Sequence, residues 1–361
     1  MNFVYWLRLL KTLSQIKGNA FMSKRPLRIA DIAKKAGVSP ATVSRVLNNH
    51  PYVRDEIRQR VLKIIEETGY QPNLAARSLA TQRTGILGFV IPRTVHTFFS
   101  DPYFARVTEG IAQACNAHDY TLSLFLFYTV EDERRMIPRL TRKGLVDGII
   151  VQSTHLQDEV LMRVMDGEVP FLLAGRPVAP LNVSYIDVDN VAGGYQATVH
   201  LLQLGRKRVA TIAGPLTTSA GIDRLEGYRK ALRERGLPVD EQLIVEGDFT
   251  EMGGYYAMRR LLPLEPDAVF VASDGMAVGA LRAIREVGKQ VPRDIAIVGY
   301  DDLPIAQSTT PPLTTIRQPI LRFGARAVEV LLDIIENGSS PPRRVVLGTE
   351  LVVRASCGAT I

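Results

Sequence analysis

Three short stretches near the N-terminus place apolar residues three and four positions apart, the spacing of one helix face. The first covers 29–36 and ends at Gly37, since glycine readily adopts the left-handed backbone that follows a helix. The second begins at Pro40 after Ser39, a residue type that caps helix N-termini, and the third covers 54–68. A helix, a tight turn and a second helix predict a helix-turn-helix motif within a three-helix head.

From residue 85 onward, apolar runs of strand length alternate with stretches of helical spacing. This alternation predicts an α/β fold with parallel sheets. The run 85–92 is expected to be a buried strand that Pro92 ends. The other expected strands are 120–127, 148–151, 171–174, 184–188, 208–212, 268–271, 295–298 and 345–347, and the expected helices are 105–117, 193–204, 224–235, 252–262, 276–287 and 320–336. The pattern is about twice as long as one doubly wound sheet needs, so we expect two similar lobes that divide near 188–190.

Charge is distributed unevenly along the 361 residues, whose net charge is +7. Residues 24–83 hold 12 Lys/Arg against 5 Asp/Glu, whereas residues 84–361 hold 29 against 32. A basic block ahead of a mildly acidic body suggests a nucleic-acid-binding head joined to a different kind of domain. A solvated basic face is the alternative explanation.

Composition excludes several other classes of protein. No run reaches the roughly 18–20 apolar residues of a membrane span, so we expect no membrane partner. The two cysteines, Cys115 and Cys357, are too few for a disulfide framework or a cysteine-rich zinc site. This usage fits a reducing cytosol, and we expect a cytoplasmic protein with no cofactor and no metal.

Residues 1–22 form an apolar segment that lacks the features of a signal peptide. Arg8 and Lys11 interrupt its apolar run, and no small-residue cleavage site follows. We expect 1–22 to be a disordered or non-native extension, with the working protein starting near Met22. A membrane anchor is the alternative.

The second helix of a helix-turn-helix enters the major groove and presents its N-terminal side chains to base edges. That surface here comprises Pro40, Ala41, Thr42, Ser44 and Arg45. Arg45 is the candidate for guanine recognition, because its planar fork can meet two acceptors at once. The residues suited to phosphate contacts are Thr42, Ser44, Asn48 and Tyr52. The alternative is a small helical bundle that uses these polar groups as caps.

Two motifs carry a resemblance to a known family. The run IADIAKKAGVSPATVSRVLN at 29–48 resembles the DNA-binding head of the lac repressor (LacI/GalR) family, and GYQPNLAARSL at 69–79 resembles its hinge. The resemblance extends through 24–357. It implies three parts, which are a helix-turn-helix domain (23–71), a hinge helix and linker (72–84) and an effector-binding and dimerisation domain (85–361).

The hinge segment 73–80 is rich in helix formers but too short to hold a helix alone in water. We expect it to order only when it docks on DNA and on a second copy of the chain. The family resemblance implies that Asn73, Ala76 and Leu79 contact DNA, with Leu79 wedged into the minor groove at the operator centre. A plain linker with Leu79 exposed is the alternative.

The body resembles the periplasmic sugar-binding-protein fold, in which the chain crosses repeatedly between two lobes. The resemblance implies that lobe one holds about 85–187 and 320–338, and lobe two about 190–315 and 345–357. A ligand is expected between the lobes, because open parallel sheets bind ligands at the carboxyl ends of their strands.

Candidate effector contacts follow from strand ends and from family matches. They are Tyr103, Phe104, Arg176, Asp189, Arg224, Phe249, Asp274 and Asp301. Arg224, Phe249 and Asp301 match effector-binding positions of the family. Asp274 opens a predicted helix, so N-capping explains it about as well, and Asp189, Asn190 and Tyr103 are similarly open.

Two departures from the family bear on the effector. Gly175 stands where many sugar-responsive members carry an acidic ligand residue, and Arg176 follows it. Thr218 stands where the purine repressor carries an arginine that grips the base, which argues against a purine corepressor. Arg176 and Arg224 could clamp an anion, so a phosphorylated or acidic sugar is one option.

No sequence feature indicates an enzyme. The chain has no P-loop, no G-x-S-x-G and no HExxH, and the pairs Gly193-Gly194 and Gly253-Gly254 suit helix packing better than phosphate binding. We therefore expect a homodimeric transcriptional repressor that binds a palindromic operator in double-stranded DNA and is controlled by a small-molecule effector, a sugar or sugar derivative. The alternatives are a corepressor-dependent regulator with a non-sugar effector, a solute-binding protein and an architectural DNA-binding protein.

Overall fold

The computed structural model describes residues 27–47, 50–70, 83–152 and 159–359. The chain divides into two units, Met1–Gln82 and Arg83–Ile361, which we call the head and the body. Across the described ranges, no helix combines the length and the apolar character that crossing a lipid bilayer requires.

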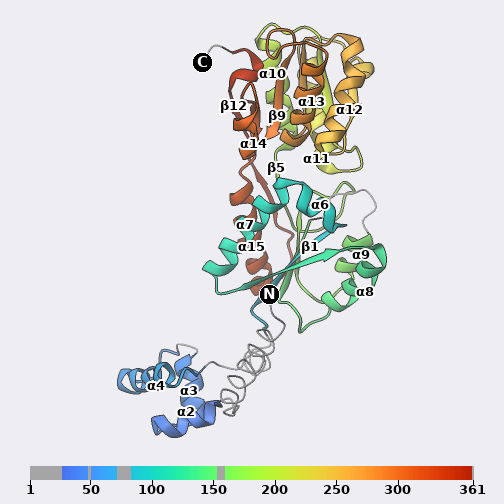
Figure 1. Ribbon diagram of the computed structural model, residues 1–361. Helices are drawn as coiled ribbons and strands as arrows, with labels where there is room; N and C mark the ends of the chain where they lie inside the picture. Colours follow the sequence, from blue (N-terminus) through green and yellow to red (C-terminus); the bar gives the residue numbers. More distant parts are fainter. Residues whose placement is uncertain (1–26, 48–49, 71–82, 153–158, 360–361) are drawn as a thin grey trace, which may run out of the picture. The chain divides into compact units, whose positions relative to one another are not determined.

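The head is helical where it is described (Figure 1). Its helices are α2 (Ile29–Ala36), α3 (Pro40–Leu47) and α4 (Asp55–Thr68). Gly37 (φ 63°) and Gly69 (φ 61°) end α2 and α4 in the left-handed region, and the Thr42 amide donates to Ser39 Oγ (3.1 Å) at the start of α3. The predicted helix-turn-helix is confirmed. The apolar faces of the three helices form a core that includes Ile32, Val43 and Val61.

The body contains two six-stranded sheets, one in each lobe. The lobe-one strands, in sheet order, are β11 (Arg344–Leu347), β5 (Tyr185–Val188), β4 (Phe171–Ala174), β3 (Gly148–Val151), β1 (Ile86–Thr94) and β2 (Thr121–Phe127). The lobe-two strands, in sheet order, are β12 (Glu350–Val352), β10 (Thr314–Arg317), β9 (Ala296–Asp301), β8 (Ala268–Val271), β6 (Val209–Ala213) and β7 (Ile244–Glu246). All neighbouring strands run parallel except β10 and β12. The predicted α/β class with two parallel sheets is confirmed.

Two expectations about strands are wrong. The strand at 345–347 belongs to lobe one and not to lobe two, because β11 pairs in parallel with β5 before the chain crosses to β12. The first strand also does not end at Pro92. β1 continues to Thr94 through an irregularity in its pairing with β2, and such a bulge tolerates a residue that cannot donate to the ladder.

Helices cover both sheets (Figure 1). Those of lobe one are α6 (Val95–Ser100), α7 (Pro102–Ala117), α8 (Val130–Leu140), α9 (Glu159–Met165) and α15 (Ile320–Asn337). Those of lobe two are α10 (Asn190–Gln203), α11 (Ser219–Glu234), α12 (Glu251–Leu261), α13 (Asp274–Glu286) and α14 (Pro304–Ser308). Sequence patterns did not predict α6, α8, α9, α14 or the short strands β7, β10 and β12.

Glycines bring pairs of helices into backbone contact. A Cβ on Gly194 of α10 would lie 2.2 Å from Arg224 O of α11, and a Cβ on Gly227 of α11 would lie 2.2 Å from Val191 O of α10. The same reciprocal arrangement joins α12 to α13 through Gly254 and Gly279, and α7 to α15 through Gly110 and Gly324. The interpretation of Gly194 and Gly254 as packing residues is therefore confirmed.

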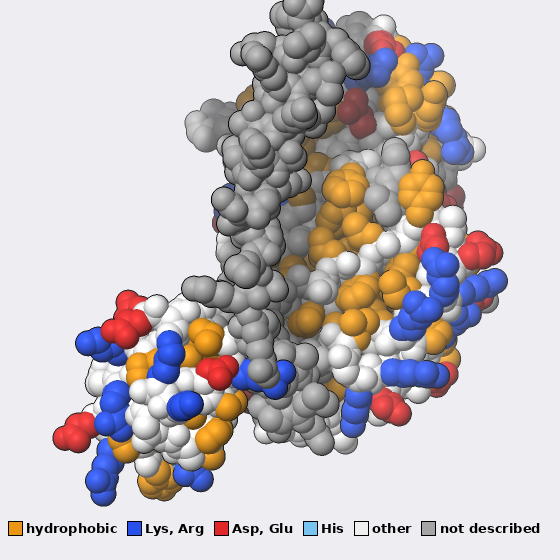
Figure 2. All heavy atoms as spheres, turned by 60° about the horizontal axis from the view of Figure 1, so that its bottom comes forward, with side chains coloured by type: hydrophobic (Ala, Val, Ile, Leu, Met, Phe, Trp, Pro, Cys, Tyr) orange, Lys and Arg blue, Asp and Glu red, His pale blue; other side chains and the backbone are white. Residues whose placement is uncertain are grey.

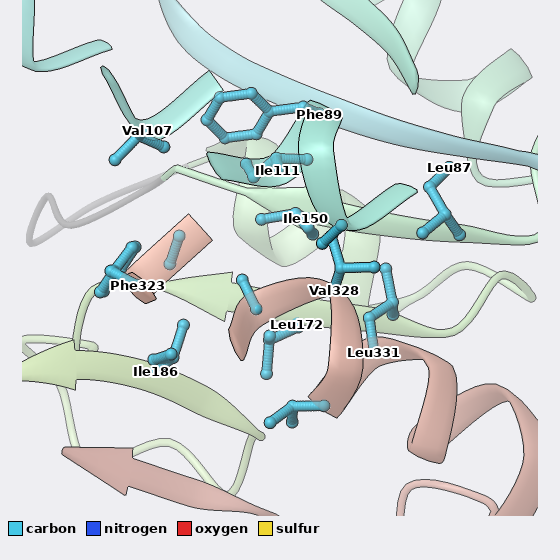
Figure 3. Packing of buried hydrophobic residues seen from close by; sticks show 14 of the residues in the cluster. Leu87, Phe89, Val107, Ile111, Ile150, Leu172, Ile186, Phe323, Val328 and Leu331 are labelled. Atoms are coloured by element: carbon cyan, nitrogen blue, oxygen red, sulfur yellow. The ribbon is translucent and has the colours of Figure 1, made fainter. Parts of the chain in front are cut away.

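One of the two hydrophobic clusters of lobe one lies between its sheet and the helices α7 and α15. Figure 3 shows strand residues such as Leu87, Phe89 and Ile150 facing Ile111 of α7 and Val328 of α15. All five are fully buried. This packing fixes the carboxyl ends of β4 and β5, where lobe one supplies candidate effector residues.

Candidate effector and DNA-binding sites

Arg224 lies at the centre of the candidate effector site. It comes from α11, is 5% exposed, and donates from Nε to Asn190 Oδ1 (2.9 Å) and from Nη1 to Ala272 O (2.6 Å). Nη1 also lies 3.6 Å from Asp301 Oδ1. The guanidinium carbon stands 3.6 Å from the centre of the Tyr300 ring, a cation–π contact. Arg224 is thus held by several elements of lobe two at once.

The network continues from Asn190 into lobe one. Asn190 Nδ2 donates to Asp187 Oδ1 (3.2 Å), and Asp187 also accepts the backbone N–H groups of Val188 (2.8 Å) and Arg176 (3.0 Å). Burial raises the pKa of Asp187 to about 6. We call Arg224, Asn190, Asp187, Tyr300 and Asp301 the Arg224 cluster.

Asp301 links the Arg224 cluster to the segment that returns to lobe one. Its Oδ1 accepts a hydrogen bond from Gln318 Nε2 (2.5 Å), and Gln318 directly follows β10, before α15 begins at Ile320. Burial raises the pKa of Asp301, and the nearby charge of Asp101 adds to this effect while Arg224 opposes it. The φ angle of Asp301 is 116°, which strains a residue other than glycine.

Three of the five described non-glycine residues with a positive φ angle belong to this region, and the other two are Asp119 and Glu265. The three are Phe249 (67°), Asp301 (116°) and Asp302 (57°). Phe249 follows β7, and its ring lies 5.9 Å from the Arg224 guanidinium carbon. Strained residues persist where the surrounding structure holds them, and they often mark functional sites.

Asp274 is not the N-cap of α13. Ser273 takes that role, because its hydroxyl accepts from the Met276 amide (3.2 Å). Asp274 is fully buried and accepts from Thr315 Oγ1 (2.6 Å) and from the Leu303 amide (2.8 Å). Burial raises its pKa, and the neighbouring Asp301 adds to the shift. Asp274 therefore ties together loops that lie next to Asp301.

The two aromatic candidates of α7 occupy different environments. Tyr103 is half-buried, and its pKa is raised by burial and by the charge of Asp187, with Arg224 opposing. Its hydroxyl therefore lies within electrostatic range of Asp187 and Arg224. Phe104 is 6% exposed and packs against Phe98 in the lobe-one core, with ring centres 6.2 Å apart. The structure thus places Phe104 in the core, where it has little surface for a ligand.

Asp189 and Arg176 already have protein partners. The exposed Asp189 caps α10 by accepting from the Ala192 amide (2.8 Å). Arg176 forms an ion pair with Asp223 of α11, with its Nη2 lying 2.7 Å from Asp223 Oδ1. Neither residue is among the direct partners of the Arg224 guanidinium.

The two departures from the family have structural counterparts. Gly175 has φ 103°, a conformation that an acidic side chain would adopt only with strain. Thr218 is 1% exposed and caps α11, accepting from the Gly221 amide (3.1 Å) and donating to Pro215 O (2.7 Å). In this chain, Gly175 provides a positive φ angle and Thr218 forms hydrogen bonds with the backbone at the start of α11.

The candidate DNA-binding surface lies along α3. Pro40, Ala41 and Arg45 are exposed, Thr42 and Ser44 are half-buried, and Tyr52 is 90% exposed. No described residue forms an ion pair with Arg45. Lys and Arg side chains are spread over the visible face of the head at the lower left of Figure 2. Asn48, Asn73, Ala76 and Leu79 lie outside the described residues.

Comparison with known proteins now places the chain. It is 40% identical over 329 residues to the HTH-type transcriptional regulator CelR of Thermobifida fusca, covering 90% of this chain and 96% of that protein. A model described as bacterial regulatory proteins, lacI family, matches residues 28–73.

The chain belongs to the LacI family.

Other matches extend over the body of this LacI-family regulator. A periplasmic binding protein-like domain matches 198–357. A solved CelR–cellobiose complex superposes with a TM-score of 0.73 at 38% identity, covering 91% of this chain and 99% of that one. A solved lac repressor dimer bound to operator and the anti-inducer ONPF superposes with a TM-score of 0.77 at 28% identity, and the match covers 93% of this chain and 100% of that one.

These matches bear on the alternatives left open by the sequence. Each of the three proteins is matched along nearly its whole length, head and body together. A solute-binding protein would lack the head, and an architectural DNA-binding protein would lack the body. The chain is a transcriptional regulator, as the sequence predicts.

Sequence reasoning missed several members of the site. Asp187, Tyr300, Gln318 and Asp223 were not among the candidates. Asp187 could have been found from the sequence, because it lies within the apolar strand Tyr185–Val188. Burying a carboxylate there costs folding free energy unless it is hydrogen-bonded, which suggests a specific role. Within the described ranges, no group of three or more His, Cys, Asp and Glu is arranged to hold a metal ion.

Proposed function

We propose that this LacI-family regulator is a repressor that binds a near-palindromic operator as a homodimer and is controlled by a sugar bound between its lobes. The Arg224 cluster carries the effector half of the proposal, because it gathers a buried cation, carboxylates and aromatic rings at strand ends. The relatives support it, since CelR was solved with cellobiose and the lac repressor dimer with operator DNA.

A sugar suits the chemistry of the Arg224 cluster. Its hydroxyl groups both donate and accept, so they can bond to Arg224 and Asp301 together, while its apolar ring face can stack on Phe249 or Tyr103. Asp274 and Phe104 would act indirectly, by holding the neighbouring loops and α7 in place. Arg176 and Asp189 lie beside this site, but their side chains already bond to Asp223 and to the Ala192 amide, so the proposal gives them no direct contact to the sugar.

A screen of sugars by thermal shift tests the effector half. A sugar that binds should raise the melting temperature of the parent and have no such effect on Asp301→Ala. Release of operator by the same sugar would identify it as an inducer. Tighter operator binding would support the corepressor alternative, and a response only to non-sugar ligands would contradict a sugar effector.

The dimer is proposed to form in part through the edge of the lobe-one sheet. β2 is one of the two edge strands of this sheet. Leu124 within it is 41% exposed, and Tyr128 and Val130 after it are 78% and 55% exposed. An apolar sheet edge exposed to water can pair with another chain, because its backbone N–H and C=O groups have no partner strand. Leu124→Lys should shift the parent dimer toward monomer in light scattering, whereas a monomeric parent would contradict the proposal.

For operator binding, the proposal assigns base recognition to Arg45. Its guanidinium has no described ion-pair partner and lies on the exposed face of α3, so it is available for two acceptors of guanine. Arg45→Ala should weaken specific binding by about 1–3 kcal/mol and relax base choice in each half-site. The hinge contacts of Asn73, Ala76 and Leu79 and the phosphate contact of Asn48 are part of the same proposal.

Selection of bound duplexes from a randomised DNA library measures this base preference. Thr42→Ala is the matched control, since it removes a phosphate contact made by the same helix and should weaken binding to all sequences alike. An Arg45→Ala variant with the sequence preference of the parent would show that Arg45 contacts phosphate.

A further inference from the structure

One ion pair connects the two lobes directly. Arg176 follows β4 of lobe one, and Asp223 lies in α11 of lobe two. Two hydrogen bonds join them, from Arg176 Nε to Asp223 Oδ2 (3.2 Å) and from Nη2 to Oδ1 (2.7 Å). Paired bonds of this kind fix orientation as well as distance. Among the ion pairs of described residues, it alone joins lobe one to lobe two.

The pair lies beside the Arg224 cluster. The backbone N–H of Arg176 donates to Asp187 Oδ2 (3.0 Å), and Asp223 directly precedes Arg224. Consecutive helical residues point about 100° apart, so Arg224 can reach into lobe two while Asp223 faces lobe one. A change in the separation of the lobes would therefore act on the pair and on the Arg224 cluster together.

A third hydrogen bond also holds the Arg176 side chain, which is 36% exposed. Its remaining nitrogen, Nη1, donates to Pro177 O (3.1 Å), so every guanidinium nitrogen has a protein acceptor. An anionic effector would have to compete with the Asp223 carboxylate, which is 16% exposed. This argues against the anion clamp and leaves Arg176 a different role.

We propose that Arg176 and Asp223 form a latch between the lobes. They are positioning residues, which favour the arrangement in which the strand ends of both lobes meet at the Arg224 cluster. The chain crosses between lobes at Asp189, at Gln318 and between β11 and β12, and the latch is separate from these crossings in sequence. Leu303 of lobe two, which packs in the lobe-one core, is the apolar contact that accompanies it.

The consequence for the effector rests on the proposed function. A ligand that bridges the lobes binds more tightly when the closed arrangement is already populated. Loss of one partly exposed, two-bonded ion pair should therefore weaken such a ligand by about 3- to 10-fold. It should do so without removing any contact to the ligand.

Distance measurements on the full-length protein test the latch without any effector. Spin labels at Arg139→Cys in lobe one and Arg235→Cys in lobe two, both exposed positions, report the separation of the lobes. The native cysteines are buried, and an excess of unlabelled chain limits each dimer to one labelled copy. Asp223→Asn and Arg176→Gln should each lengthen or broaden the distance distribution, and the exchanged pair Arg176→Asp with Asp223→Arg should restore it.

The control is an ion pair on the same helix that stays within lobe two. Arg229 Nη2 lies 3.0 and 2.9 Å from the two carboxylate oxygens of Glu241, so Arg229→Gln breaks a comparable pair without crossing the lobes. It should leave the distance distribution unchanged. Distributions of the two latch variants identical to the parent would overturn the latch, whether or not any sugar binds.

A binding experiment with cellobiose and glucose 6-phosphate as probes separates the latch from direct ligand contact. With cellobiose, each single latch variant should lose about 3- to 10-fold in affinity, and the double neutral variant should lose no more than either single variant. Tighter binding of glucose 6-phosphate by Asp223→Asn would instead show that Arg176, once freed, is an anion site. Failure of the parent to bind any sugar would refute the proposed effector, and the distance measurements would still decide the latch.

Discussion

The two lobes share one strand order but differ in how their helices pack. In lobe two, both helix pairs, α10 with α11 and α12 with α13, meet through reciprocal glycines. In lobe one, α7 and α15 do so, whereas α8 and α9 cover the other face of the sheet with larger side chains such as Ile137 and Val164. The last strand differs too, since β11 runs parallel to its neighbour and β12 antiparallel.

The difference bears on how each lobe positions its residues of the Arg224 cluster. Because the α10 and α11 backbones touch at Gly194 and Gly227, Asn190 and Arg224 are fixed with 2.9 Å between their bonded atoms. Close backbone packing within lobe two therefore sets the position of Arg224 relative to Asn190. Lobe one contributes Asp187 and Tyr103 from across the junction, and its contribution depends on the separation of the lobes.

The largest expected effect comes from filling the glycine contacts. Gly227→Val would place a Cβ 2.2 Å from Val191 O, and Gly110→Val would place one 2.3 Å from Leu321 O. Backbone atoms cannot move aside cheaply, so each variant should lose on the order of 3 kcal/mol or more of unfolding free energy. Hydrogen exchange should locate the loss in lobe two for Gly227→Val and in lobe one for Gly110→Val.

Gly348→Ala is the matched control, because its added Cβ meets no atom within 4 Å. It should melt like the parent. Equal loss of protection in both lobes after either valine substitution would contradict the view that each lobe packs as its own unit.

Removal of Arg224 should have the next largest effect. Arg224→Ala leaves Asp301 buried without its cation, which typically costs about 3–5 kcal/mol of unfolding free energy. It should also abolish the response to effector while operator binding survives, and calorimetry with DNA-binding assays measures both. Arg229→Ala, at a half-buried position of the same helix, is the control. Unfolded Arg224→Ala and Asp301→Ala proteins would favour a purely structural pair.

The lobe-one carboxylate Asp187 should make stability depend on pH. Its pKa is raised from 3.8 to about 6 by burial, so the folded protein binds a proton more tightly than the unfolded chain. This part of the unfolding free energy is present below about pH 4 and is lost as the pH rises through about 6. The Asp187→Asn variant has no proton-binding group at this position. The difference in unfolding free energy between the unsubstituted protein and this variant should therefore fall by about 2 kcal/mol between pH 4.5 and pH 7.5. A constant difference in denaturant unfolding would contradict this assignment.

The smallest effect is expected at the junction between the lobes. Asp189→Ala removes the cap of α10, a change that usually costs about 1 kcal/mol. Asp189→Asn should retain most of the stability, because its amide oxygen can also accept from the Ala192 amide. Effector affinity should be unchanged in both variants, and a loss of affinity in Asp189→Asn with normal melting would make Asp189 a ligand contact.

Local patterns predicted most of the elements. α2, α3 and α4 follow from helical periodicity and from caps within four residues, and β3, β4 and β8 coincide with short apolar runs. α8 was missed because its sequence is strongly charged and contains Pro138, although Thr129 caps it by accepting from the Asp132 amide. β7 and β12 span three residues each, too few for a periodic pattern.

By itself, the sequence determined the head and the two-sheet body, because these depend on local spacing and on motifs that stay together in the chain. It also named Arg224, Phe249 and Asp301 as candidates for the effector site, through the resemblance to the family. Only the tertiary structure decided which side chains share a network. Tyr300 and Asn190 are 110 positions apart and Arg224 and Asn190 are 34 apart, yet all three meet. Tertiary structure also decided that β11 joins the lobe-one sheet and that Arg176 pairs with Asp223. Such contacts arise from strand order and helix packing, and no local pattern specifies them.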